Sequence, residues 1–340
     1  MKKLLQKASM VSLTMLLLIG CSTSTEKKQR TADDYKNATK FMQRSWYGKV
    51  HNQIVSQNWK DDVLTYSKRT ANGTEYVSVN AKTKEKKTLN DYKAPKRERS
   101  KAKRFEHVSP NGKLAAYIDD YNLWVRDLAT NRKTQLTFDG KEDYGYATNN
   151  AGWTKSNNAV LKWSPNSDKI ATFQQDARGV GMMYLTTTNV GHQKLEAWKH
   201  PLPGDKTIFT IERVIIHLGA RPKMVRLKMK KDFQRGTTTD HIAGRGGVLL
   251  DAQWSKDGSK FAFVSGSRDH KEAHLQIADA RTGRVSSIHK EVVDTYYESG
   301  VRAENWRVLF DSNEFIWYSE KSNWGHMYLY DLNTKKLKNQ

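Results

Sequence analysis

The sequence predicts an all-β protein of the β-propeller type, and two observations predict it. First, a hairpin phrase recurs along the chain, with its clearest copies at 108–117, 161–173 and 253–264. Each copy places a turn rich in Asn, Asp, Ser and Gly between two β-prone stretches, which is typical of β-hairpins. Second, apart from one interval of double length, the copies are spaced by roughly 45 to 55 residues, which is the length of a four-stranded propeller blade.

Further strand-like segments complete each predicted blade. They lie at 123–128, 183–185 and 275–279, and polar turns follow the first and last of them at Thr130-Asn131 and Thr282-Gly283. A degenerate copy of the phrase opens the series at 58–66, and a last copy spans 314–331. The interval between Ser164 and Ser255 has double length, and we expect it to hold one further blade with strands at 208–211 and 225–229. The pattern predicts about five or six blades.

The ring of a propeller explains why such a unit repeats. A single four-stranded sheet cannot bury both of its faces, whereas a ring of sheets buries them against one another and shields most edges. A β-sandwich is the alternative, but sandwiches do not usually repeat a Trp-Ser-x-Asp-Gly-like phrase at blade spacing. Four tryptophans occupy repeat positions, and we expect them to pack between blades rather than to stack on a ligand; they are Trp124, Trp163, Trp254 and Trp317.

The N-terminus has the features of an export signal. Lys2 and Lys3 precede an apolar stretch that ends at Gly20 and is too short to span a membrane comfortably. Leu18-Ile19-Gly20-Cys21 contains the chain's one cysteine and resembles the bacterial lipobox, which implies cleavage before Cys21 and lipid attachment to its thiol. A plain signal peptide followed by a chance cysteine is the alternative. We expect a signal peptide over 1–20, a polar lipidated tether over 21–44 and a partial, incomplete propeller over 45–340.

The expected location is the bacterial cell envelope. A bacterial lipoprotein usually carries three acyl chains, and two or more chains are enough for stable anchoring. By resemblance to the sorting of Gram-negative lipoproteins, Ser22 favours a periplasm-facing position on the outer membrane. Because the chain has one cysteine, it forms no intramolecular disulfide, and its stability must come from packing.

The formal net charge of +22 favours anionic partners. The densest basic tract runs from Lys82 to Arg104, and it is either a solvated loop between blades or a contact for anionic lipid headgroups or lipopolysaccharide. We expect no nucleic-acid partner, because no recognition fold is evident.

Two short motifs predict no cofactor or metal site. His270 and His274 have the spacing of two metal ligands on a helix, but they lie between predicted strands and favour a solvated hairpin turn. The segment 243–247 is rich in glycine, but it lacks the Gly-Lys-Ser/Thr ending of a phosphate loop and precedes a strand. We therefore expect no cofactor and no metal.

Two phrases carry a resemblance to a known family. Asn323–Asp331, and Leu161–Pro165 together with Ile170-Ala171, resemble propeller phrases of dipeptidyl peptidase IV and its bacterial relatives in the prolyl oligopeptidase family. The resemblance implies an eight-bladed propeller that precedes a C-terminal α/β-hydrolase domain with a Ser/Asp/His triad. It also implies a serine-type dipeptidyl peptidase, in which the propeller gates peptide substrates and helps to hold their amino termini.

The chain departs from the family pattern in two places. It contains no Gly-x-Ser-x-Gly nucleophile elbow, so we expect no catalytic residue in it. The segment that corresponds to the family's substrate-binding glutamate pair is Asp143–Trp153, and it holds no adjacent glutamates. The sequence predicts the propeller region of a peptidase, inactive alone, with a hydrolase domain or chain as partner. The alternative is a stand-alone envelope lipoprotein that binds peptides or glycans in a propeller funnel.

Overall fold

The computed structural model describes residues 29–42, 49–90, 92, 102–148, 157–233, 242, 249–297 and 305–340. The chain divides into two compact units, residues 1–97 and 98–340. The predicted propeller, 45–340, is therefore divided between the two units. Within the described part of the chain, no helix is both long and apolar enough to span a bilayer.

The first unit contains a short helix and one four-stranded antiparallel sheet. Helix α2 spans Ala32–Thr39, inside the segment expected to be a tether. It begins at a capping box, in which the Thr31 hydroxyl and the Asp34 carboxylate each accept the other residue's backbone N–H. The sheet, blade 1, has the strand order β1-β2-β3-β4. Its strands are β1 (Ile54–Lys60), β2 (Val63–Thr70), β3 (Gly73–Asn80) and β4 (Lys86–Thr88).

The second unit contains four further blades in chain order. Blade 2 consists of β5 (His107–Val108), β6 (Leu114–Asp119), β7 (Asn122–Asp127) and β8 (Lys133–Gln135). Blade 3 consists of β9 (Lys162–Trp163), β10 (Lys169–Asp176), β13 (Thr210–His217) and β14 (Lys223–Arg226), with β15 (Asp232–Phe233) also paired to β13. Blade 4 consists of β16 (Ala252–Trp254), β17 (Lys260–Gly266), β18 (Glu272–Asp279) and β19 (Val285–Val292). Blade 5 consists of β20 (Trp306–Leu309), β21 (Glu314–Ser319), β22 (His326–Asp331) and β23 (Leu337–Asn339).

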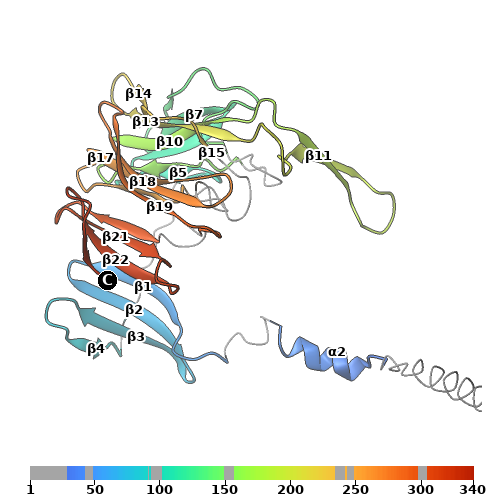
Figure 1. Ribbon diagram of the computed structural model, residues 1–340, viewed down its shortest axis with the longest axis vertical. Coiled ribbons are helices and arrows are strands. Elements are labelled where there is room, and N and C mark those ends of the chain that lie inside the picture. The colour runs from blue at the N-terminus through green and yellow to red at the C-terminus, as the bar shows by residue number, and fades with distance from the viewer. Residues whose placement is uncertain are drawn as a thin grey trace, which may run out of the picture. The chain divides into compact units, whose positions relative to one another are not determined.

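The expected extra blade between Ser164 and Ser255 was wrong for the residues described. The candidate strands there belong to blade 3, because β13 pairs with β10 along its whole length and β14 pairs with β13. The interval is long because a two-stranded hairpin, β11 (Met182–Thr186) and β12 (Leu195–Lys199), is inserted between β10 and β13. Figure 1 shows β11 extending away from the sheet of blade 3. The segment 183–185, predicted to be a blade strand, lies in this hairpin.

A shared serine turn explains why the hairpin phrase recurs. Ser109, Ser164 and Ser255 each end the first strand of a blade, and each is almost fully buried. In each turn the serine hydroxyl accepts the backbone N–H of the residue five positions later, at 2.9 to 3.0 Å. The same hydroxyl donates to an Asn or Asp side chain within the turn. The phrase therefore encodes the connection between the first two strands of a blade.

A second repeated turn joins the third and fourth strands. Asp127, Asp279 and Asp331 each accept backbone N–H groups two or three residues ahead, and Asn80 does the same in blade 1. The fifth residue of each turn has a positive φ and donates its N–H back to the carbonyl of the first. The two turn types connect strand 1 to 2 and strand 3 to 4, so alternation of strand direction places them on one face of the second unit. The opposite face receives the strand 2–3 connections and the links between blades.

Three apolar cores lie between consecutive blades of the second unit. The alternation of side chains along each strand sends neighbouring residues to different cores. In blade 3, Ile170 joins the core shared with blade 2, whereas Ala171 and Phe173 join the core shared with blade 4. In blade 4, Phe261 and Phe263 face blade 3, and Ala262 and Val264 face blade 5. This sequential packing of sheets confirms the propeller prediction, with five blades in the part of the chain that is described.

The repeat tryptophans also connect blades. The indole N–H of Trp163 donates to the carbonyl of His107 at 3.0 Å, and that of Trp254 donates to the carbonyl of Lys162 at 3.1 Å. Trp317 is fully buried in the core between blades 4 and 5. Trp124 is half-buried and belongs to none of the core clusters among the described residues. The predicted packing role therefore holds for three of the four tryptophans.

A buried ion pair within blade 3 contacts blade 4. The Nε of Arg213 lies 3.0 Å from Oδ2 of Asp232, and the two side chains are only 2% and 7% exposed. The guanidinium also donates to the carbonyl of Val264 and lies over the ring of Phe263 at 4.5 Å. The hydroxyl of Ser265 donates to the same carboxylate oxygen at 2.8 Å.

We expect Arg213→Met to lower the free energy of unfolding by about 3–5 kcal/mol, because it leaves the Asp232 carboxylate buried without its cation. The control is Lys290→Met, which removes the partner of Glu272 from a pair whose side chains are 47% and 45% exposed. That change should cost less than about 1 kcal/mol. Urea unfolding of the two variants measures both values. Equal losses would contradict a structural role for the buried pair.

Candidate functional site

Two cavities of the second unit open on the face that carries the strand 2–3 connections. The first, here the acidic cavity, has a volume of about 450 Å³ and lies beside the base of the inserted hairpin. The second, here the tyrosine cavity, has a volume of about 1140 Å³ and lies between the end of β19 and the β21–β22 turn. The repeated short turns occupy the other face, so the variable connections build both cavities.

Two pairs of adjacent acids line the acidic cavity. Asp119-Asp120 come from the β6–β7 turn, and Glu142-Asp143 come from the segment that follows β8. Tyr121, Thr148, Trp198 and Phe209 contribute to the walls, and Lys199 is the one cation among the residues that line this cavity. Lys199 lies 2.6 Å from Asp143 and also donates to the carbonyl of Ala177 at 2.8 Å. Four carboxylates against one ammonium group make this cavity locally negative in a strongly basic protein.

The side chain of Asn122 brings the two acid pairs together. Its amide nitrogen donates to the carbonyls of Asp120 and Gly140, and its oxygen accepts the N–H of Gly140 at 3.0 Å. A Cβ atom on residue 140 would lie 2.2 Å from the carbonyl oxygen of Tyr121, so only glycine permits this approach. Asp120 and Tyr121 both have positive φ, which produces the tight turn.

The electrostatics of the acidic cavity suit a ligand that carries a cation and also a hydrogen-bond acceptor. Burial raises the pKa of Tyr121, and the nearby carboxylates of Glu142, Asp120 and Asp143 raise it further. The phenol therefore stays protonated in a negative field. The indole N–H of Trp198 is buried and makes no hydrogen bond within the described residues. The cavity thus combines anionic acceptors, aromatic walls and one spare donor.

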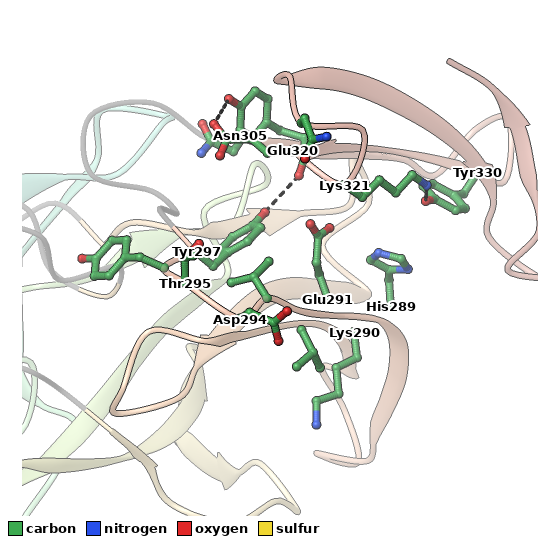
Figure 2. Close-up of a pocket in the computed structure, with 15 residues that line it drawn as sticks. His289, Lys290, Glu291, Asp294, Thr295, Tyr297, Asn305, Glu320, Lys321 and Tyr330 are labelled. Carbon is green, nitrogen blue, oxygen red and sulfur yellow. Dashed lines mark hydrogen bonds between the residues drawn. The ribbon is translucent and has the colours of Figure 1, made fainter.

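The tyrosine cavity has mixed charge and four tyrosines in its lining (Figure 2). Tyr297 is buried and donates its hydroxyl to the carbonyl of Tyr318 at 3.1 Å. Tyr318 in turn donates to Glu320 at 2.9 Å, which raises the pKa of the Tyr318 phenol. Lys321 donates to Tyr330 at 3.0 Å, and its ammonium lies 3.9 Å from the ring centroid of Tyr328.

Glu291 is held at the wall of the tyrosine cavity by two short hydrogen bonds. It accepts from the indole of Trp317 and from the hydroxyl of Ser319, each at 2.6 Å. Both donors come from β21, so Glu291 fixes β19 of blade 4 against blade 5. In Figure 2 the side chain of Asp294 lies on the other side of the cavity from Lys321. The cavity therefore offers carboxylates, an ammonium group and phenols to one ligand.

His289 lies beside Glu291 among aromatic rings. Its ring centroid lies 4.9 Å from that of Tyr330, 5.1 Å from that of Trp317 and 5.6 Å from that of Phe315. Burial, together with the charges of Lys321 and His274, lowers the pKa of His289 to about 4. The imidazole is therefore neutral at physiological pH.

Several residues singled out from the sequence lie outside the described part of the chain. These are the lipid-attachment residue Cys21, the glycine-rich segment 243–247 and Asn149–Trp153 of the segment matched to the glutamate pair. The basic tract is described only at 82–90, 92 and 102–104. The prediction of a lipid anchor at Cys21 stays a prediction.

The other predicted segments are placed. His270 lies in the β17–β18 turn and stacks on Tyr296 at 4.4 Å, and His274 lies on β18 and bonds to Ser287. They are on a hairpin, as expected, and not on one face of a helix. Among the described residues, no group of three or more His, Cys, Asp or Glu side chains is arranged to hold a metal ion.

The acidic cavity was not predicted from the sequence. The segment matched to the glutamate pair, Asp143–Trp153, begins one position after Glu142. Asp119-Asp120 lies 22 residues before Glu142, and only the fold joins the two acid pairs. Two adjacent acid pairs in a basic chain were the available signal.

Comparison with known proteins now decides the family. Residues 52–340 match the model of the dipeptidyl peptidase IV N-terminal region. The chain belongs to this family. The match covers both compact units, so blade 1 and blades 2–5 are parts of one family region.

Two solved structures are similar to this dipeptidyl peptidase IV N-terminal region. Porphyromonas gingivalis dipeptidyl peptidase 4 aligns with a TM-score of 0.52 and 14% identity, over 85% of this chain and 37% of the other. A Bacteroides ovatus protein described as a dipeptidyl aminopeptidase IV aligns with a TM-score of 0.49 and 19% identity, over 83% of this chain and 35% of the other. The chain thus spans little more than a third of the length of either protein. The similarity to the Porphyromonas gingivalis structure supports a shared fold.

We expect protonation of His289 to destabilise the fold. The unfolded side chain has a pKa near 6.5, whereas the folded one has a pKa of about 4. Between these values the unfolded state binds the proton and the folded state does not, so stability falls as pH decreases from about 6.5 to 4. Solvent screening of a partly exposed ring reduces the effect to about 1–2 kcal/mol.

The measurement is the urea midpoint between pH 7 and pH 4 for the parent and for His289→Gln. The variant should lose less stability over this range. His107 and His274, whose pKa values are also lowered by burial, remain in both proteins and cancel in the comparison. The same slope in both proteins would show that His289 does not contribute.

Proposed function

We propose that this chain is the substrate-gating propeller region of a dipeptidyl peptidase IV-like serine peptidase and that it does not hydrolyse peptides alone. The observation that carries the proposal is the family match over 52–340. The sequence of the chain contains no Gly-x-Ser-x-Gly elbow, so the nucleophile would come from a hydrolase domain or a separate chain. The propeller would then select which peptides reach that nucleophile.

The acidic cavity supports a role in holding the amino terminus of a peptide. An ammonium group is a compact cation with three donors, and carboxylates are its strongest acceptors. In this cavity Lys199 is already bonded to Asp143, which leaves Asp119, Asp120 and Glu142 as the acids nearest to a free amine. Glu142 and the pair Asp119-Asp120 would take the place of the two adjacent glutamates that the resemblance implies.

The tyrosine cavity supports contact with the rest of an extended peptide. Its phenols and carboxylates offer acceptors and donors, and its aromatic rings offer flat apolar surfaces. Both cavities belong to the face of the propeller that carries the long connections, which is the face where a fold of this kind varies between functions.

We further propose that the chain is an outer-membrane lipoprotein attached through Cys21, facing the periplasm. The lipobox-like Leu18-Ile19-Gly20-Cys21 and the following Ser22 support this location.

The second candidate function is a stand-alone lipoprotein that binds peptides or glycans. The two cavities favour it in one respect, because each is lined entirely by residues of the second unit and needs no other chain to form.

The purified chain should release no chromophore from glycyl-prolyl-p-nitroanilide. The reason is that no activated nucleophile accompanies the propeller. A fluorophosphonate probe, which labels serine nucleophiles, should leave the chain unlabelled and would expose a contaminating hydrolase. Release of chromophore by a labelled chain would contradict the proposal.

Neutralising the acidic cavity should weaken the binding of peptides with a free amino terminus. We expect the double variant Asp120→Asn and Glu142→Gln to raise the Kd of a fluorescent glycyl-prolyl peptide about tenfold, since two carboxylates are lost. The matched control, Glu272→Gln with Asp311→Asn, removes the same charge from other places in blades 4 and 5 and should change the Kd less than about twofold.

The acetylated form of the same peptide separates the two candidate functions. Under the gating proposal it binds weakly to the parent and is not affected by the double variant, because it has no ammonium group. Equal binding of the free and acetylated peptides would contradict amine recognition and favour the stand-alone binding protein. Fluorescence anisotropy measures all of these constants.

A further inference from the structure

The outer edge of blades 3 and 4 carries an unpaired basic surface, here called the basic rim. It consists of six exposed side chains: Arg221, Lys223, Lys228, Lys230, Arg281 and Arg284. The first four belong to β14 and the residues around it, and the last two belong to the β18–β19 turn. None of the six forms an ion pair with a residue that the structure describes. Neither of the two cavities includes any of them.

Backbone contacts fix the two segments of the basic rim side by side. The N–H of Lys228 donates to the carbonyl of Gly283 at 2.8 Å, and Lys228 forms a parallel bridge with Arg284. A Cβ atom on residue 283, whose φ is 70°, would lie 2.5 Å from the carbonyl oxygen of Arg226. Glycine therefore permits the close approach that brings Arg281 and Arg284 to β14.

The other end of the basic rim is held by a histidine. Nε2 of His217 bonds to the carbonyl of Ala280 at 2.8 Å, and His217 is the β13 partner of Lys223. Arg281, which follows Ala280, is thus placed beside the start of β14. The six cations are therefore carried on a fixed surface that includes residues from two blades.

Nearby acids do not neutralise the basic rim. Glu212 and Asp176 are paired with Arg226 and Lys231, two cations of the same stretch that are not part of the rim. Asp279 lies near Arg281, but its Oδ1 accepts from both the backbone N–H and the hydroxyl of Thr282. Six like charges at one edge repel one another, so the surface is suited to a partner with many negative charges.

The residue types indicate which polyanion fits. Residues 221–231 and 281–284 contain no aromatic side chain, so the rim offers no platform for stacking nucleic-acid bases. It also offers separate point charges on β14 and the residues around it, and not a closed pocket for a single phosphate. A plane of phosphate headgroups matches such a set of charges, and each lysine or arginine near an anionic membrane contributes about 1 kcal/mol.

We propose that the basic rim binds the phosphate headgroups of an anionic lipid surface. A lipid at Cys21 would keep the protein close to a bilayer and raise the local concentration of headgroups around the rim. The rim then determines which edge of the propeller faces the membrane. The two cavities, which open on the face with the strand 2–3 connections, are not part of this membrane contact.

The test uses the chain from residue 21 onward with Cys21→Ser, so that neither the apolar N-terminal stretch nor an acyl chain contributes to binding. The probe is vesicles of about one-third phosphatidylglycerol in phosphatidylcholine at low salt, and binding is measured by co-sedimentation. The rim variant carries Lys228→Gln, Lys230→Gln and Arg284→Gln. We expect it to lower the partition coefficient at least about tenfold, since three contributions are lost. Binding by the parent should disappear in vesicles of phosphatidylcholine alone and weaken at high salt.

The matched control removes the same charge from dispersed positions, with Lys113→Gln, Lys194→Gln and Lys336→Gln in blade 2, the inserted hairpin and blade 5. It should retain most of the binding. Equal loss in the rim and dispersed variants would overturn the proposal, because net charge and not the rim would then be responsible. No binding by the parent would overturn it as well. Tighter binding to duplex DNA than to vesicles at the same salt would reassign the rim to nucleic acid. None of these results depends on peptide binding in the acidic cavity.

Discussion

The second unit depends on one constraint: a blade with two apolar faces can bury both of them only between neighbours. Blade 4 shows this most clearly, because Phe261 and Phe263 enter one core while Ala262 and Val264, on the same strand, enter the next. A blade removed from the series would expose both sets. The blades are also joined by polar contacts that a loose stack of sheets would lack, such as the indole of Trp254 on the carbonyl of Lys162 and the hydroxyl of Ser265 on the carboxylate of Asp232. Stability is therefore a property of the series.

The same constraint separates the two faces of the propeller. The connections between strands 1 and 2 and between strands 3 and 4 repeat from blade to blade as the Ser and Asp motifs. The remaining connections only have to reach the next strand, so they can lengthen without disturbing the cores. In blade 3 one of them has become the β11–β12 hairpin, whose Tyr184, Leu185 and Leu195 are exposed. Both cavities lie among these connections, which explains how a repetitive fold acquires a site that does not repeat.

This separation also explains what the sequence could predict. The Ser109, Ser164 and Ser255 turns are local, so their spacing was enough to predict the blades and the propeller. The inserted hairpin was misread as part of a blade, because Met183-Tyr184-Leu185 is as β-prone as a true blade strand and only pairing distinguishes the two. The acidic cavity could not be predicted from spacing at all. Its acid pairs are joined by Asn122 and Gly140, whose contacts exist only once β7 and the segment after β8 lie together.

Charge acts in two ways in this molecule: over long distances through solvent, and at contact distance inside the acidic cavity. The two effects do not oppose each other. The net charge of +22 and the basic rim act through solvent, where salt screens interactions beyond about 8 Å. A peptide ammonium bound in the acidic cavity, as proposed, would instead meet carboxylates at contact distance, beside the partly buried Tyr121 and Trp198, where screening is weaker. Added salt should therefore release the rim from an anionic surface well before it releases an amine from the cavity. The proposed binding of a cationic substrate by a basic protein is therefore consistent with its charge, because the acids of the cavity are adjacent and their one cation, Lys199, is already paired with Asp143.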